Sequence, residues 1–420
     1  MRDRDAGPGE EPYTPRPDTP HEVDGPHGAH DPYRRSRRFG AEPYDPDVGG
    51  WADPGEVIDA AGPRTGGADG LTVAVVGASG NFGSSVVTAL ADDPRVGRVL
   101  GIARRAPGWR PPKTTWVTAD VLRERRLGEL FRTADAVVQL AWLFQPTHRP
   151  ALTWRNNVLG SLRVFEAAAD AAVPALIHAS SVGAYSPGPK NRPVDESWPT
   201  HGWPEAAYCR EKAYLERCLD TFERQYPWVR VVRLRPGFLF KREAATEQRR
   251  LFAGPLLPRG LVQPGRLPVV PDLPGLRMQV LHTDDAAEAV RAAVTSTVRG
   301  PFNLAADPVV DADLLARMFG ARTVRLPAAP LRAGLRAAWR TRLVPASPQL
   351  FDAVLRLPLM DTARAREELG WRPRHTSEEA LGEFLRGLRA GDGMDTPPLT
   401  PRLPGGGRLR ETATRLRAQP

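Results

Sequence analysis

Hydrophobic and polar positions fall into a regular pattern from residue 71 onward. Short apolar runs rich in β-branched residues alternate with longer stretches in which apolar residues recur every three or four positions. The runs predict strands at 72–76, 98–103, 116–118, 136–140, 175–179 and 229–234, and the stretches predict helices at 81–92, 157–172, 284–297, 311–319 and 376–389. Strands that alternate with helices indicate right-handed crossovers and a mostly parallel sheet covered on both faces. The pattern therefore predicts an α/β fold with a doubly wound parallel sheet.

The two ends of the chain lack this pattern. Residues 1–70 contain 11 Pro and 12 Gly, and they carry 15 acidic residues against 8 Arg. Such a composition buries too little apolar surface to offset about 1–2 kcal/mol of backbone entropy per ordered residue. We therefore expect disordered tails at 1–70 and, from similar composition, at 391–420. Between them we expect a dinucleotide-binding domain at 71–240 and a smaller substrate-binding lobe, with elements that return to the sheet, at 241–390.

Charge and composition exclude several classes of protein. Without its predicted tails the chain carries 45 basic and 31 acidic residues, a field that suits phosphorylated cofactors or acidic substrates. No basic run is interleaved with aromatic residues, so nucleic acid is not an expected partner. No run of 18 apolar residues occurs, which predicts a soluble, cytoplasmic protein. No cluster of His, Cys and Asp has metal-ligand spacing. A homodimer is compatible with the sequence, which does not identify the oligomer.

The two cysteines, Cys209 and Cys218, are expected on one helix. At about 1.5 Å per residue they would then lie roughly 13 Å apart, too far for a disulfide. Nothing in the sequence therefore indicates an oxidising compartment.

A glycine-rich loop joins the first predicted strand to the first predicted helix. In G-x-x-G-x-x-G spacing, Gly77 permits the tight turn, Gly80 lets the backbone approach a pyrophosphate, and Gly83 lets the helix pack on the sheet. Free N–H groups at the start of the helix then face the phosphates. The loop residues assigned to cofactor binding are Gly77, Ser79, Gly80, Asn81, Phe82 and Gly83.

The ends of the second and third strands bear on the choice of cofactor. Ala103 ends the second strand, at the place where an acidic residue usually binds the adenosine ribose, and Arg104 and Arg105 follow it. Guanidinium groups can hold a 2′-phosphate there, which favours NADP over NAD. Surface arginines without a ligand are the alternative in so Arg-rich a chain. Asp120 and Val121, after the third strand, are expected beside the adenine.

Three side chains form a candidate catalytic group. Ser181 follows the strand at 175–179, so its hydroxyl is expected at the carboxyl edge of the sheet, where ligands bind. Tyr208 and Lys212 are four residues apart and share one face of a helix. A cation beside a phenol favours the phenolate and lowers the pKa from its usual value of about 10. In a dinucleotide-binding fold this arrangement predicts acid/base catalysis by Tyr208.

These motifs together resemble the extended short-chain dehydrogenases/reductases, the group that includes NAD-dependent epimerase/dehydratases. The similarity covers about 72–388 and includes the glycine loop, Asp120-Val121, Leu140-Ala141, Asn157-Val158-Leu159-Gly160, Ser180-Ser181-Val182-Gly183-Ala184-Tyr185, Tyr208/Lys212, Arg233-Leu234-Arg235-Pro236-Gly237, His282-Thr283-Asp284-Asp285 and Glu368-Leu369-Gly370-Trp371-Arg372-Pro373. It implies that Tyr208 is the acid/base, that Lys212 binds the nicotinamide ribose, and that Ser181 binds the reacting oxygen. It further implies that the cofactor site is lined by Leu140, Ala141, Trp142 and Pro236.

Departures from the family pattern bear on the reaction. Val182-Gly183-Ala184 replace the acidic pair that sugar dehydratases carry after the serine motif, which argues against dehydration. Met278 replaces the Arg with which nucleotide-sugar epimerases grip phosphates, and Gln139 replaces a His often seen before Leu-Ala. Trp142 and Phe144 either shape an apolar substrate pocket or simply cover the sheet edge.

Three functions remain open. The first is an NAD(P)-dependent oxidoreductase acting on a carbonyl or secondary alcohol. The second is a sugar epimerase that uses the same three residues. The third is an inactive NAD(P)-binding sensor or scaffold, which would have no reason to retain Tyr208 and Lys212.

Overall fold

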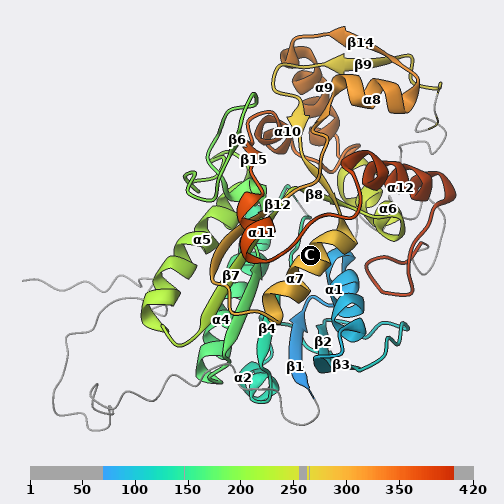
Figure 1. Cartoon of the computed structure of the whole chain (residues 1–420). Coiled ribbons are helices and arrows are strands. Elements are labelled where there is room, and N and C mark those ends of the chain that lie inside the picture. Colours follow the sequence, from blue (N-terminus) through green and yellow to red (C-terminus); the bar gives the residue numbers. More distant parts are fainter. Residues whose placement is uncertain (1–69, 146, 255–262, 264, 402–420) are drawn as a thin grey trace, which may run out of the picture. The chain divides into compact units, whose positions relative to one another are not determined.

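A parallel sheet forms the centre of the computed structural model, which describes residues 70–145, 147–254, 263 and 265–401 (Figure 1). Within these residues the sheet has seven strands in the order β12-β7-β5-β4-β1-β2-β3. Their bounds are β1 (Leu71–Val76), β2 (Val96–Ala103), β3 (Thr114–Thr118), β4 (Ala136–Gln139), β5 (Ala175–Ala179), β7 (Arg230–Pro236) and β12 (Gly300–Leu304). Strands are added on one side of β1 and then on the other, so β1 and β4 flank the topological switch point. The predicted doubly wound, Rossmann-type sheet is confirmed.

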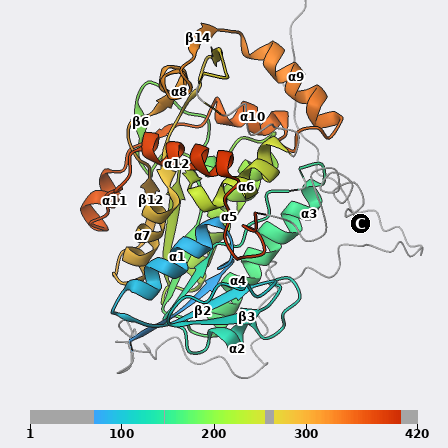
Figure 2. The same cartoon turned by 90° about the vertical axis from the view of Figure 1, so that its right-hand side faces the viewer.

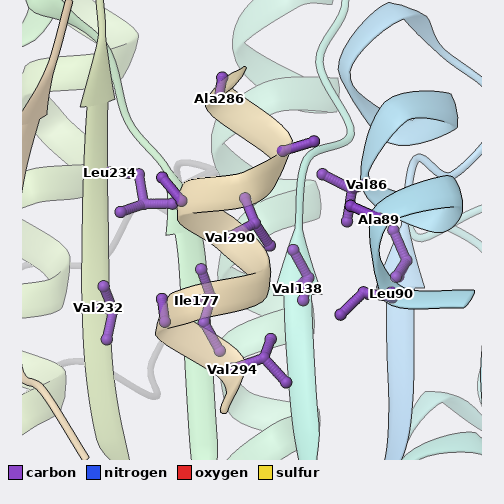
Figure 3. Packing of buried hydrophobic residues seen from close by; sticks show 14 of the residues in the cluster. Val86, Ala89, Leu90, Val138, Ile177, Val232, Leu234, Ala286, Val290 and Val294 are labelled. Atoms are coloured by element: carbon purple, nitrogen blue, oxygen red, sulfur yellow. The ribbon is translucent and has the colours of Figure 1, made fainter. Parts of the chain in front are cut away.

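Side chains alternate between two cores, one on each face of the sheet. In β1, Val73 and Val75 join the core on one face, and Ala74 and Val76 join the other. The first core is covered by α1 (Asn81–Asp92) and α7 (Thr283–Val294), and the second by α2 (Leu127–Phe131), α4 (Gly160–Asp170) and α5 (Ala207–Gln225). Figure 3 shows α7 with its apolar side chains turned toward the strands and toward α1. The strands are apolar on both faces because helices cover both.

The helix predicted at 157–172 is longer and less regular than expected. It begins with α3 (Pro150–Trp154), passes through a π-helical turn at Arg155–Leu159, and continues as α4. Pro150 stands at its first position, where the missing N–H costs nothing. The π turn includes Asn157, whose buried side chain takes part in the site described below.

Segments after residue 240 contribute both to the central sheet and to smaller paired strands. β8 (Phe238–Phe240) pairs with β11 (Val280–His282), β9 (Val269–Asp272) with β14 (Arg322–Arg325), β10 (Arg277–Met278) with β13 (Val310–Asp311), and β15 (Leu359–Met360) with β6 (Pro193–Val194). The helices are α6 (Ala245–Gln248), α8 (Ala312–Phe319), α9 (Ala328–Arg340), α10 (Pro348–Val354), α11 (Ala363–Glu368) and α12 (Ser377–Ala390) (Figure 2). β12 and α7 come after residue 240 but belong to the central sheet and the core beside it. That residues 241–390 form a substrate-binding lobe stays a prediction.

The structure describes part of the predicted C-terminal tail but almost none of the predicted N-terminal tail. The tail at 1–70 lies outside the described residues except for Gly70, and so does the chain beyond Pro401. Residues 391–401, in contrast, pack onto the fold: Leu399 is fully buried, and Arg250 donates to the carbonyls of Pro398 and Thr400 at 2.8 and 2.9 Å. The structured chain therefore extends past the predicted start of the tail at Gly391, because a single buried Leu and paired carbonyls hold a Pro- and Gly-rich segment.

Three smaller expectations can be compared with the structure. Cys209 and Cys218 both lie on α5 and are free thiols, as predicted. In the described part of the chain, no helix has the length and apolar character that a membrane crossing requires. Across those same residues, no group of three His, Cys, Asp or Glu side chains is placed to bind a metal.

Candidate active site

The glycine loop turns sharply between β1 and α1. Gly77 has φ +86°, and a Cβ there would lie 2.6 Å from the backbone nitrogen of Ala141. A Cβ on Gly83 would lie 2.2 Å from the carbonyl oxygen of Gly77. A Cβ on Gly80 would meet nothing closer than that same oxygen at 3.6 Å. Gly77 and Gly83 are therefore needed for packing within the protein, whereas Gly80 leaves open space above the backbone.

The first turn of α1 has no side-chain cap. Gly80 precedes the helix without a capping side chain, and no acidic residue stands in the first turn. Asn81 is held in place, since its Oδ1 accepts a hydrogen bond of 3.3 Å from Thr283 Oγ1. Ser79 is buried and Phe82 packs against the core. A cap that supplies no side-chain acceptor leaves the helix N-terminus free for an anionic group.

Most of the other predicted cofactor-binding residues lie at the carboxyl edge of the same sheet. They are Arg104 and Arg105 after β2, Asp120 and Val121 after β3, Leu140, Ala141 and Trp142 after β4, and Pro236 at the end of β7. Both arginines are exposed and form no ion pair with another described residue. Asp120 is engaged in its own turn, where its Oδ1 accepts from the Leu122 N–H at 3.0 Å.

Ser181 and Tyr208 meet where β5 ends. The Ser181 hydroxyl accepts a hydrogen bond from the Gly183 N–H at 3.0 Å and also bonds to the Tyr208 phenol. The Tyr208 ring lies directly over Gly183, where a Cβ would come within 2.7 Å of Cε1. Burial raises the pKa of Tyr208, and the Ser181 hydrogen bond only partly opposes that rise. The phenol is therefore protonated at neutral pH.

Lys212 lies one turn after Tyr208 on α5 and turns toward the end of β5. Its ammonium donates to the Ala179 carbonyl at 2.7 Å and lies 3.5 Å from the centre of the Trp142 ring. Burial lowers the Lys212 pKa to about 7, although the carboxylates of Glu211 and Glu216 oppose the decrease. Burial and Ser181, not Lys212, are the main influences on the Tyr208 pKa here, so the expected effect of Lys212 on the phenol stays a prediction. The Lys212 ammonium donates to a backbone carbonyl. Loss of solvation on burial is the main cause of the raised pKa of the Tyr208 phenol.

Glu211 connects α5 with the segment after β4. Its Oε1 accepts from Thr153 Oγ1 at 2.6 Å, and its Oε2 accepts from Asn157 Nδ2 at 2.7 Å. Asn157 in turn bonds both backbone groups of Leu143, at 2.7 and 2.9 Å. Sequence reasoning missed this buried carboxylate, although its position between Tyr208 and Lys212 was a signal.

A second buried network fixes the end of β5. Arg235 donates from Nε and Nη2 to the two oxygens of Glu216, both at 2.9 Å, and Ser180 Oγ donates to Glu216 at 2.6 Å. Burial opposes ionisation of Glu216, but the Arg235 contacts outweigh it and lower the pKa to about 2. Because Ser180 is engaged here, Ser181 is the serine that faces Tyr208. Glu216 and Arg235 were not among the predicted site residues.

Aromatic rings surround Tyr208. Phe144 stacks on it with centroids 5.4 Å apart and planes 14° apart, and Trp142 meets it edge-on at 5.6 Å. Phe252 packs edge-on against Phe144 at 5.5 Å. Trp142 and Phe144 also line a cavity beside Tyr208, so of their two predicted roles the pocket is the one that the geometry supports.

The sheet edge fits a dinucleotide cofactor. The space above Gly80 and the uncapped start of α1 suit a pyrophosphate, and Lys212 and Trp142 adjoin the end of β4 at the switch point. Fold and loop together define an α/β protein with a Rossmann-type, dinucleotide-binding sheet.

The family follows from comparison with known proteins. The model of the NAD dependent epimerase/dehydratase family matches residues 73–305, and the chain belongs to this family. An uncharacterized protein of Mycobacterium tuberculosis is 26% identical over 337 residues, which cover 75% of this chain and 83% of that protein. An uncharacterized protein of Sinorhizobium fredii is 25% identical over 333 residues, or 76% of this chain and 79% of that protein. The resemblance found in the sequence motifs is thereby confirmed.

Solved structures show the same fold. UDP-glucose 4-epimerase of Thermotoga maritima, solved with UDP-glucose, is 20% identical with a TM-score of 0.57, covering 76% of this chain and 99% of that one. UDP-glucose 4-epimerase of Thermus thermophilus, in complex with NAD, is 21% identical with a TM-score of 0.56 over the same shares. At such identities the likeness concerns the fold alone.

Proposed function

We propose that the protein is an NAD(P)-dependent oxidoreductase that interconverts a carbonyl compound and a secondary alcohol. The observation that carries the proposal is the contact of Ser181 with Tyr208 beside a cavity, at the sheet edge that also presents the glycine loop. Retention of all three catalytic side chains in one place argues against an inactive sensor or scaffold.

The residues of the chain have distinct tasks in this reaction. The loop at 77–83 and the first turn of α1 would hold the pyrophosphate, and Lys212, Leu140, Ala141, Trp142 and Pro236 would adjoin the rest of the cofactor. A bound nicotinamide supplies or accepts the hydride. Ser181 donates to the substrate oxygen, and Tyr208 gives that oxygen its proton when a carbonyl is reduced. The phenol carries its proton at neutral pH, as reduction requires, and its pKa must fall from the raised value when it acts as a base in the reverse direction.

Three departures from the family pattern bear on the choice between simple oxidation or reduction and sugar-nucleotide chemistry. Val182, Gly183 and Ala184, which follow Ser181, offer no acid or base for an elimination. Met278 packs against an apolar cluster, so it brings no charge toward a diphosphate. Gln139 is buried and donates to Ser161 Oγ at 3.0 Å, which makes it part of the interior.

Replacement of Tyr208 tests the proposal. Tyr208→Phe keeps the ring and its stacking but removes the only proton of the phenol, so turnover should fall at least about 10²-fold while cofactor affinity stays nearly constant. Lys212→Ala should weaken both, and Ser181→Ala should lower turnover alone. The measurement is nicotinamide absorbance during turnover of a panel of ketones, alcohols and sugar nucleotides.

Two results would contradict the assignment. Near-normal turnover in Tyr208→Phe would show that the proton moves by another route. Product formation without net change in nicotinamide absorbance would identify an epimerase that returns its hydride to the substrate.

A further inference from the structure

A cavity of about 230 Å³ lies beside Tyr208, lined by the segment after β4, the start of α5, and residues of the helices α9 and α10. We infer that it binds a small, uncharged aromatic ketone or aldehyde, or the corresponding alcohol. This inference rests on the proposed oxidoreductase function and names its substrate class. It depends on three features of the cavity: its rings, its charge and its size.

The walls present aromatic rings from three distant parts of the chain. Phe144 stacks on Tyr208 and is still 37% exposed. Phe252 packs edge-on against Phe144. Trp339 of α9 is fixed in place, since it stacks on His148 at 4.0 Å and its Nε1 donates to Thr147 Oγ1 at 2.9 Å. Rings that are already held in position gain contact with a further ring at little cost in conformational entropy.

The charges on the walls do not suit a phosphorylated ligand. The lining includes one cationic side chain, Arg210, and two carboxylates, Glu205 and Glu211. Arg210 is exposed and donates to the Pro204 carbonyl, while Glu211 is satisfied by its two buried donors. Diphosphates are bound by converging cations or free N–H groups. Apolar rings, not converging cations, line this cavity. We therefore expect its ligand to be uncharged.

The volume limits the size of the ligand. Sites for drug-sized molecules occupy about 300–1,000 Å³, and this one is smaller. One ring with a short carbonyl substituent fits such a space, whereas a complete nucleotide sugar exceeds it. The carbonyl end is expected at Tyr208, because that is the lining residue with a catalytic proton.

Binding can be measured separately from turnover. We would titrate acetophenone into the protein saturated with NADP⁺, using isothermal calorimetry on the wild type and on Tyr208→Phe. Cyclohexyl methyl ketone is the matched ligand without an aromatic ring, and UDP-glucose represents the nucleotide sugars. Acetophenone should bind at least about threefold more tightly than the cyclohexyl ketone, and UDP-glucose should not compete with it.

Ring-removing variants locate the site. Phe144→Leu and Trp339→Leu should each weaken acetophenone binding by about two- to tenfold, the usual effect of one aromatic pair. Phe144→Tyr keeps the ring and should bind as the wild type does. Thermal unfolding and NADP⁺ affinity, measured on every variant, show that the fold and the cofactor site are intact.

The outcomes separate the two proposals. Binding of acetophenone that Phe144→Leu and Trp339→Leu weaken, with no turnover of any ketone or alcohol of the panel, would support the pocket and overturn the oxidoreductase. Equal affinity for the two ketones, or tighter binding of UDP-glucose, would overturn the aromatic pocket even if another carbonyl compound were reduced.

Discussion

Burial affects the two central titratable residues in opposite directions. It raises the pKa of the Tyr208 phenol and lowers that of the Lys212 ammonium to about 7, because a low-dielectric environment disfavours whichever form is charged. The phenol therefore holds its proton at neutral pH, and Lys212 is near its titration midpoint.

Lys212 should make stability depend on pH. Its pKa is about 7 in the folded chain and 10.5 ordinarily, so between these values the unfolded chain binds the extra proton. The cost of burying the ammonium is complete below pH 7 and is relieved as the pH rises toward 10.5, by up to about 1.4 kcal/mol per unit. Between pH 7.5 and pH 9.5 the free energy of unfolding of the wild type should rise by about 2 kcal/mol relative to that of Lys212→Met. Denaturant unfolding at the two pH values measures this difference. If the free energy of unfolding depends on pH in the same way for both proteins, this prediction is wrong.

At the scale of elements, the strand–loop–helix unit makes a sharp distinction between two of its glycines. Gly83→Ala would place a methyl group 2.2 Å from the Gly77 carbonyl oxygen, so the loop must shift. We expect the free energy of unfolding to fall by about 2–4 kcal/mol and cofactor binding to be lost. Gly80→Ala is the control. Its methyl meets only an ordinary contact at 3.6 Å, so thermal stability should hold while cofactor affinity falls. If both variants melt like the wild type, the packing role of Gly83 is wrong.

The loop after β2 should decide which cofactor is preferred. Arg104 is exposed and unpaired among the described residues, so it is available to a 2′-phosphate. We expect NADP to bind more tightly than NAD and Arg104→Asp to narrow or reverse the preference, since a charge-assisted contact contributes about 1.5–3 kcal/mol. That energy corresponds to roughly ten- to hundredfold in affinity. Equal dissociation constants for the two cofactors in the unmodified protein would show that the arginines are surface charges.

At the scale of the whole molecule, the last described segment ties distant regions together. Arg242 forms an ion pair with Asp392, the Trp109 N–H donates to the Asp395 carbonyl at 3.1 Å, and Leu399 is fully buried. The segment therefore links the turn after β8 with the loop between β2 and β3.

Truncation tests this link. A chain that ends at Ala390 loses the burial of Leu399 and should be less stable by about 2–3 kcal/mol, the usual value for one buried Leu. A chain that ends at Pro401 keeps every contact described here and should unfold at the wild-type temperature. Thermal unfolding of the two truncated chains provides the comparison, and a stable chain ending at Ala390 would show that the segment contributes nothing.

The sequence by itself predicted six of the seven strands of the central sheet, the glycine loop, and the place of Ser181 at the carboxyl edge of that sheet. These depend on local periodicity, on the sterics of single glycines, and on the rule that parallel strands end at one edge. Tertiary structure alone decided the direction of the Lys212 ammonium, the carboxylate network of Glu211, and the cavity to which Phe252 and Trp339 contribute. Residues so far apart in the chain carry no shared pattern, because their contacts arise only when separate elements pack, and desolvation follows from that packing.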